Sequence, residues 1–169
     1  MDKHLVRVLD TNGDGTGTKE ATGTYAVDTD FYIEPLADET NLIYRLERLI
    51  VTVKDTTGMD ADKYGNGITL TNGIYVLVED SEGLLYSLTD PDKPILTNGD
   101  WSHYCYDADV KTWGTGNEHL VVRWTFRKHG DSVNLRSWRG EKLVVRLKDT
   151  FTGLLDHTFT VEGLESTNI

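Results

Sequence analysis

Residues 10–17 place oxygen-bearing side chains at alternate positions, as the first ligands of a calcium-binding loop do, with a glycine at the sixth position where such loops turn. The twelfth position of such a loop is a bidentate glutamate, but here it is Ala21, with Glu20 one place early. A Gly-rich turn, in which Asp and Asn accept hydrogen bonds from their own backbone, explains the same residues. Both interpretations stay open at this stage. The calcium ligands would be Asp10, Asn12 and Asp14.

Patterns that support catalysis are not found in the sequence. There is no Gly-x-Ser-x-Gly turn, no phosphate-binding Gly-x-x-x-x-Gly-Lys-Ser/Thr loop, and no metal-binding spacing among the five histidines. The single cysteine, Cys105, lies in an alternating aromatic run, where a small buried thiol is expected. Among 28 acidic residues, a glycosidase pair is not identifiable from sequence. We therefore expect no enzyme activity, and no cofactor other than calcium at residues 10–17.

Charge is distributed unevenly along the chain. Its 17 basic and 28 acidic side chains give a net charge of −11. Residues 1–100 hold the whole acidic excess, whereas residues 121–148 hold 8 basic side chains against 2 acidic ones. A net acidic protein is poorly suited to neutralising phosphates, so we expect no nucleic-acid partner. No stretch approaches the roughly 18 to 20 apolar residues of a membrane span, so we expect no membrane partner either.

The basic segment, residues 121–148, has two interpretations. Its cations can be the solvated outer faces of two strands, with arginine stems covering apolar surface. Alternatively, they form a face that docks on the acidic surface of another copy or of a partner. Trp138 between two arginines suits an interface anchor, although a core tryptophan explains it at least as well. The interface candidates are Arg123, Arg127, Arg136, Trp138, Arg139 and Arg146.

Short apolar segments separated by runs of Thr, Asn, Asp and Gly predict an all-β chain. The clearest strand is residues 120–127, in which Trp124 and Phe126 share the apolar face and Arg123 the opposite one. In residues 142–148, Leu143, Val145 and Leu147 are expected to point inward, and Val144, Arg146 and Lys148 outward. Further strands are expected at residues 3–9, 25–27, 31–34, 74–79, 84–88, 101–106 and 157–161, with a turn at residues 81–83.

The apolar pattern changes parity within residues 41–54. Leu42, Tyr44 and Leu46 share one parity, whereas Leu49 and Val51 share the other. A β-bulge near residues 47–48 would bring both sets to one face of a long strand. An amphipathic helix over residues 38–50 is the alternative, but β-branched residues and a turn sequence follow it, which favours the strand.

These segments predict an antiparallel β-sandwich with jelly-roll-like connections. With 38% hydrophobic residues, the chain has enough apolar surface for a core of its own. We expect one domain over residues 1–164 and a flexible C-terminal tail over residues 165–169.

Three stretches carry a family resemblance: residues 10–18, residues 59–73 and residues 98–126. Together they resemble a small virion structural protein of tailed bacteriophages. The resemblance implies location in the virion, as a head decoration or cement protein that forms a homo-oligomer and contacts the major capsid protein and neighbouring copies of itself. The alternative is a tail or fibre module that recognises a host-surface glycan or receptor through exposed aromatic residues. Those aromatics would be Tyr64, Trp101, Tyr104 and Trp113.

Overall fold

The computed structural model describes the backbone of ten segments of the chain. These are residues 2–15, 28–36, 41–55, 63–64, 68–69, 74–88, 106–112, 118–126, 133–148 and 156–167. Their regular elements are antiparallel β-strands and the short 3-10 helix η2 (Ser137–Arg139), so the all-β prediction is confirmed. Among the described residues, no helix is long and apolar enough to span a membrane.

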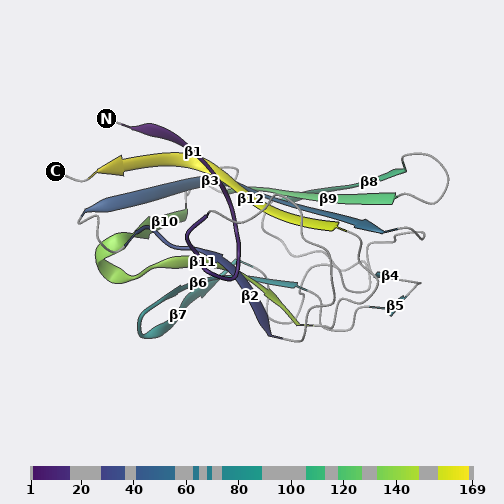
Figure 1. The fold of residues 1–169 in the computed structure, drawn as a ribbon, viewed down its shortest axis with the longest axis horizontal. Helices are drawn as coiled ribbons and strands as arrows, with labels where there is room; N and C mark the ends of the chain where they lie inside the picture. Colours follow the sequence, from purple (N-terminus) through teal and green to yellow (C-terminus); the bar gives the residue numbers. More distant parts are fainter. Residues whose placement is uncertain are drawn as a thin grey trace.

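The strands form two main sheets, which lie as layers one above the other in Figure 1. The six-stranded sheet has the order β1-β12-β3-β9-β8, and β10 also pairs with β3. Its strands are β1 (Lys3–Val8), β12 (Asp156–Thr167), β3 (Leu42–Asp55), β9 (Glu118–Thr125), β8 (Tyr106–Thr112) and β10 (Val133–Arg136). The four-stranded sheet has the order β2 (Thr29–Ile33), β11 (Lys142–Leu147), β6 (Ile74–Asp80) and β7 (Gly83–Ser87). A separate two-stranded ladder joins β4 (Lys63–Tyr64) to β5 (Ile68–Thr69).

A single cluster of buried hydrophobic side chains fills the space between the two sheets. Leu49 and Phe159 contribute from the six-stranded sheet, and Phe31 and Val145 from the four-stranded sheet. Because alternate residues of a strand point to opposite faces, each sheet contributes one apolar face to this shared core. The molecule is therefore sandwich-like, as the sequence predicts.

The predicted bulge in β3 is present. Arg48 pairs with Glu162 of β12, but the next residue of β12, Gly163, pairs with Leu46, so Glu47 is the extra residue of β3. Leu46 and Leu49 are both fully buried, which is the change of parity that the sequence shows. The alternative helix over residues 38–50 is wrong where the structure describes the segment, because residues 42–50 are strand.

The C-terminal strand is longer than predicted. The sequence indicates a tail from residue 165, but β12 continues through Thr167, and Glu165 pairs with both Lys3 of β1 and Tyr44 of β3. Ser166 is also buried. The polar composition of this segment suggested fraying, whereas backbone pairing on two sides, which does not depend on side-chain polarity, holds it in the sheet.

In the described residues, the predicted strand faces agree with the structure, but the exposure predicted for one residue is wrong. Phe126 is buried and Arg123 is exposed, as expected, while the side chain of Trp124 lies outside the described part of the chain. In β11, the three residues predicted to point inward are all in the core. Val144, predicted to point outward, is fully buried on the other face, where its register partners are Leu77 and Tyr32.

Several other expectations can be compared with the described residues. Strands at residues 3–9, 31–34, 74–79, 84–88 and 157–161 are present with shifted ends, and the turn at residues 81–83 is present. Asp80 stabilises this turn, because its Oδ1 accepts the backbone N–H groups of Glu82 at 2.8 Å and Gly83 at 3.1 Å. The predicted strand at residues 25–27 and residues 101–105 lie outside the described part. Most of β8 and all of β4, β5 and β10 are not predicted by the sequence pattern.

Candidate protein interface at one end of the four-stranded sheet

The segment predicted to bind calcium forms a turn whose carboxylate is used by its own backbone. Asp10 Oδ1 accepts the N–H groups of Asn12 at 3.0 Å and Gly13 at 2.6 Å. Asn12 and Asp14 are exposed. Among the described residues, no three His, Cys, Asp or Glu side chains are grouped so that they could hold a metal ion. This is the geometry of the Gly-rich turn, and calcium binding stays a prediction.

Substituting Asp10 tests the role of this carboxylate. We expect Asp10→Ala to lower the free energy of unfolding by about 1–2 kcal/mol, because two backbone N–H groups lose their acceptor. Asp10→Asn keeps an acceptor oxygen and should lose less, as measured by urea unfolding. If Asp10→Asn loses as much as Asp10→Ala, these hydrogen bonds do not stabilise the turn; if calcium raises the melting temperature of the unsubstituted protein but not that of Asp10→Ala, the turn binds a cation.

The basic segment does not form one continuous face. Arg123 is exposed on β9 of the six-stranded sheet, whereas Arg146 is on β11 of the four-stranded sheet. Arg127 lies outside the described residues. The prediction of a single basic face is therefore wrong, because neighbouring strands in the sequence belong to opposite layers of the molecule.

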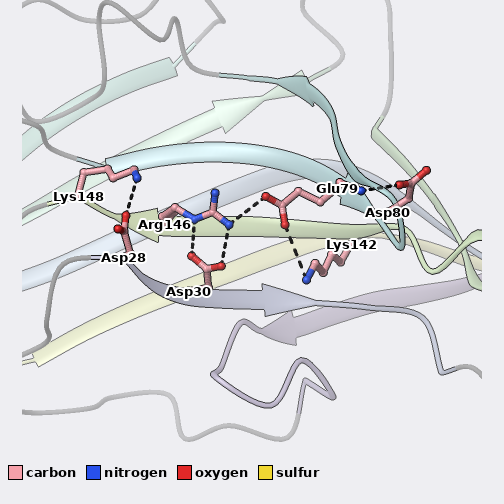
Figure 2. Close-up of polar contacts among 8 residues, drawn as sticks. Asp28, Asp30, Glu79, Asp80, Lys142, Arg146 and Lys148 are labelled. Carbon is pink, nitrogen blue, oxygen red and sulfur yellow. Dashed lines mark hydrogen bonds and ion pairs between the residues drawn. The ribbon is translucent and has the colours of Figure 1, made fainter.

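On the outer face of the four-stranded sheet, acidic residues from the first part of the chain pair with the basic residues of β11 and with Lys148 directly after it (Figure 2). Arg146 makes two hydrogen bonds to Asp30, at 2.7 and 2.9 Å, and one to Glu79 at 2.9 Å. Lys142 also pairs with Glu79, at 3.8 Å. Lys148 hydrogen-bonds to Asp28, the residue before β2. The hydrogen bond to Asp30, followed by the nearby carboxylate charges, holds the pKa of Arg146 above its ordinary value.

This polar row also explains the burial of Val144. Lys142 Nζ lies 5.0 Å from the centre of the Tyr32 ring. Tyr32, on β2, is the register partner of Val144, and Lys142 lies two residues before Val144 on β11. Arg146 flanks Val144 on the other side along β11. Long side chains that are fixed by ion pairs thus surround an apolar residue on the outer face. Arg146 is therefore engaged within the molecule, and the interface hypothesis does not extend to it.

The pair between Lys148 and Asp28 offers a test by titration. Hydrogen bonding to Lys148 Nζ, together with the charges of Lys148 and Arg146, lowers the pKa of Asp28 below its ordinary value of 3.8. A lowered carboxyl pKa contributes stability above the ordinary pKa, and this contribution is lost as the pH falls through the folded-state pKa. We expect Lys148→Met to raise the pKa of Asp28, measured by NMR titration of its side-chain carbon. An unchanged pKa would contradict the pairing.

The connection from β10 to β11 is a corner formed by η2 and held by hydrogen bonds at both ends. Ser137 is buried, and its Oγ accepts the N–H of Leu42, at the start of β3, at 3.1 Å. Gly140 ends the turn in the left-handed conformation, with φ of 61°, and donates its N–H to the Ser137 carbonyl at 3.1 Å. Glu141, only 3% exposed, accepts the Arg136 N–H at 2.9 Å and pairs with the Arg136 guanidinium at 3.7 Å.

This corner presents an aromatic and a basic side chain to solvent. Trp138 is 48% exposed, so the core interpretation is wrong for this residue. Arg139 next to it is exposed, whereas Arg136 is partly covered and paired with a buried carboxylate. Tryptophan and arginine are the residues that most often dominate protein interfaces. Of the six candidates, the structure brings Arg136, Trp138 and Arg139 together.

Further exposed apolar residues belong to the same end of the four-stranded sheet. A Cβ built on Gly140 would lie 3.8 Å from Glu34 Oε1 and 3.8 Å from Ser81 Cβ, so η2, the end of β2 and the β6–β7 turn meet there. We define the Trp138 surface as Leu36, Glu82, Leu84, Leu85, Trp138 and Arg139, all of them exposed.

The leucines of this surface are not among the site residues predicted from the sequence. One signal was available for two of them: Leu84 and Leu85 are adjacent in a predicted strand, and strand alternation sends one of any adjacent pair away from the core. Leu36 has no such signal, because it follows a proline in a connecting segment.

The aromatic residues of the alternative binding hypothesis are not placed by the structure. Trp101, Tyr104 and Trp113, like the side chain of Tyr64, lie outside the described part of the chain. This hypothesis stays a prediction.

A shallow depression lies elsewhere, over the β3 bulge, with a volume of about 120 Å³. It is small beside the roughly 300–1,000 Å³ of small-molecule sites. Two of its charged residues, Arg48 and Glu162, pair with each other at 3.4 Å. The Trp138 surface is therefore the better candidate for a functional contact.

In comparisons with known proteins, no family model, curated protein or solved structure matches the chain.

Proposed function

We propose that this chain is a structural component of a tailed-bacteriophage virion, acting as a decoration or cement protein that binds the outer surface of the head. The resemblance of residues 10–18, 59–73 and 98–126 motivates the proposal. The observation that carries it is the exposure of Trp138 on a corner with a buried serine and a buried glutamate at its two ends. A large aromatic side chain kept in solvent by a rigid support is well suited to bind another protein.

Rigidity favours this role energetically. Binding costs free energy for each side chain or loop that becomes ordered at the interface. The hydrogen bonds of Ser137 and Glu141 already fix the η2 backbone, so docking orders little more than the side chains of Trp138 and Arg139. We propose the major capsid protein and neighbouring copies of this chain as the partners.

We also propose that the two sheets are connected as a jelly roll. The first strand lies beside the last, β1 beside β12, and in the other sheet the second lies beside the second last, β2 beside β11. Nested pairing of this kind supports a long hairpin that is rolled into two layers. Double-sheet folds of this class occur in viral capsid proteins and in lectins, which fits both the proposal and its alternative.

The test is the copy number of the chain in purified particles, measured by quantitative mass spectrometry against the major capsid protein. A fixed stoichiometric ratio to the shell protein is expected for a decoration protein. A few copies per particle would instead favour the tail or fibre module, and absence from particles would refute the virion proposal.

A second measurement links the proposal to Trp138. Particles that lack the chain are mixed with purified protein, and binding is followed by co-sedimentation. We expect Trp138→Ala to weaken binding about thirtyfold, the effect typical of an interface anchor. Val6→Ala, which truncates an apolar side chain exposed on the six-stranded sheet, is the matched control and should bind as the unsubstituted protein does.

A further inference from the structure

Exposed apolar side chains are concentrated on the Trp138 surface. The large hydrophobic residues that are exposed in the described part of the chain are Val6, Leu36, Leu84, Leu85 and Trp138, and all but Val6 belong to this surface. The junction is formed by Glu34, Gly140 and Ser81. Leu36 is two residues from Glu34, and Trp138 is two residues from Gly140. Leu84 and Leu85 are three and four residues from Ser81. A chain spans at most about 3.6 Å per residue, so each of the four backbones lies within about 14 Å of the junction residue of its own segment.

Both signs of charge border this apolar cluster. Arg139 adjoins Gly140, and Glu82 adjoins Ser81, so the two exposed charges flank the same junction. Within the described residues, none of the ion pairs closer than 4.0 Å joins Arg139 to Glu82. A surface that carries an exposed cation and an exposed anion side by side can be complementary to itself, because a two-fold rotation about an axis between them places each charge opposite its counterpart.

The edge of the sheet supports the same arrangement. β7 is the outermost strand of the four-stranded sheet in the described part of the chain, and it carries Leu84, 61% exposed, and Leu85, 44% exposed. An edge strand with exposed apolar residues tends to be covered by another chain. Neither a proline nor a lysine, two residues that commonly block edge pairing, occurs in Gly83–Ser87.

We propose that the Trp138 surface binds a second copy of this chain about a two-fold axis, with Arg139 of each copy facing Glu82 of the other. The inference rests on the proposed function and assigns this surface to a neighbouring copy on the head, so that Trp138→Ala weakens binding to particles through loss of the dimer. The two symmetry-related ion pairs lie at the junction, and the leucines and Trp138 supply the apolar part of the contact. The contact therefore closes as a dimer and leaves no second copy of the surface free.

Sedimentation equilibrium of the isolated protein tests the proposal. We expect a concentration-dependent dimer, with Arg139→Glu and Glu82→Arg each weakening dimerisation about tenfold at low salt, because each places like charges opposite one another. The double variant, Glu82→Arg with Arg139→Glu, should restore the dimer, since exchanging both signs recreates both pairs. Arg123→Glu is the control for a change of the same charge away from the surface, and thermal melts establish that every variant is folded.

Three results would overturn the proposal. These are a monomer at all concentrations, a dimer that neither single variant weakens, and a double variant that dimerises no better than the singles. The experiment needs no virus particle, so its failure is separate from that of the proposed function. A monomer found in fixed ratio to the capsid protein would refute the dimer alone and would assign the Trp138 surface to the shell protein.

Discussion

Replacing Gly163 by alanine should lower the free energy of unfolding by about 3 kcal/mol or more, the largest effect expected for a change of one methyl group. Gly163 lies in β12 opposite the bulge of β3. A Cβ at this position would lie 2.1 Å from the Arg45 carbonyl oxygen and 2.9 Å from Leu46 Cα. These are backbone atoms of a strand that is paired on both sides, so they cannot move aside without disturbing the sheet.

Gly140→Ala is the matched control, because it changes the backbone preference without a clash. Gly140 has φ of 61°, but the nearest atoms to an added Cβ are 3.8 Å away. We expect a loss of about 1–2 kcal/mol, the cost of the left-handed conformation alone. Both variants are measured by urea unfolding. If Gly163→Ala is no more destabilising than Gly140→Ala, β12 does not approach β3 as closely as the structure shows.

The bulge itself was predictable, because it leaves a trace in the sequence. Apolar residues change parity between Leu46 and Leu49, and only an extra residue keeps both on one face of a strand. The glycine that the bulge requires was not predictable. Gly163 is more than 100 residues away in sequence, and its place opposite Leu46 depends on register between β3 and β12.

Strand alternation predicts which residues share a face but not whether that face is exposed. In β11, the core residues were identified correctly, whereas Val144 was assigned to solvent and is fully buried. Its burial depends on side chains from other strands, including Tyr32 of β2. The same limit applies to Arg146, whose partners Asp30 and Glu79 come from two other strands. Charge counts detected the acidic and basic segments but not that they pair within one molecule.

The candidate interface was only partly visible in the sequence. Arg136, Trp138 and Arg139 were identified as a group because a tryptophan between arginines has the composition of an interface. Whether Trp138 is buried in the core or exposed at the surface depends on the direction of the chain at this corner. That direction is set by the short helix η2 and by Gly140 in the left-handed conformation. A turn of this length is too short to show the apolar period of a strand or helix, so the sequence does not predict whether Trp138 is buried or exposed.

Replacing Glu141 by alanine is the second change from which we expect a large effect. The carboxylate is 3% exposed and holds Arg136 twice, through its backbone N–H at 2.9 Å and through its guanidinium at 3.7 Å. Alanine leaves the Arg136 N–H without this acceptor and opens a cavity at a buried position, whereas the guanidinium, 38% exposed, is partly solvated in its place. We expect a loss of about 2–3 kcal/mol in the free energy of unfolding, measured by urea denaturation.

Glu141→Gln separates the hydrogen bond from the charge. Glutamine keeps an oxygen that accepts the Arg136 N–H, so we expect a loss of about 1 kcal/mol and a slowly exchanging Arg136 amide. In Glu141→Ala the same amide should exchange faster, because it has lost its acceptor. Equal exchange in the two variants would mean that the carboxylate does not fix the corner. Since the corner holds Trp138 in solvent, faster exchange in Glu141→Ala should be accompanied by weaker dimerisation, which connects the buried carboxylate to the exposed surface.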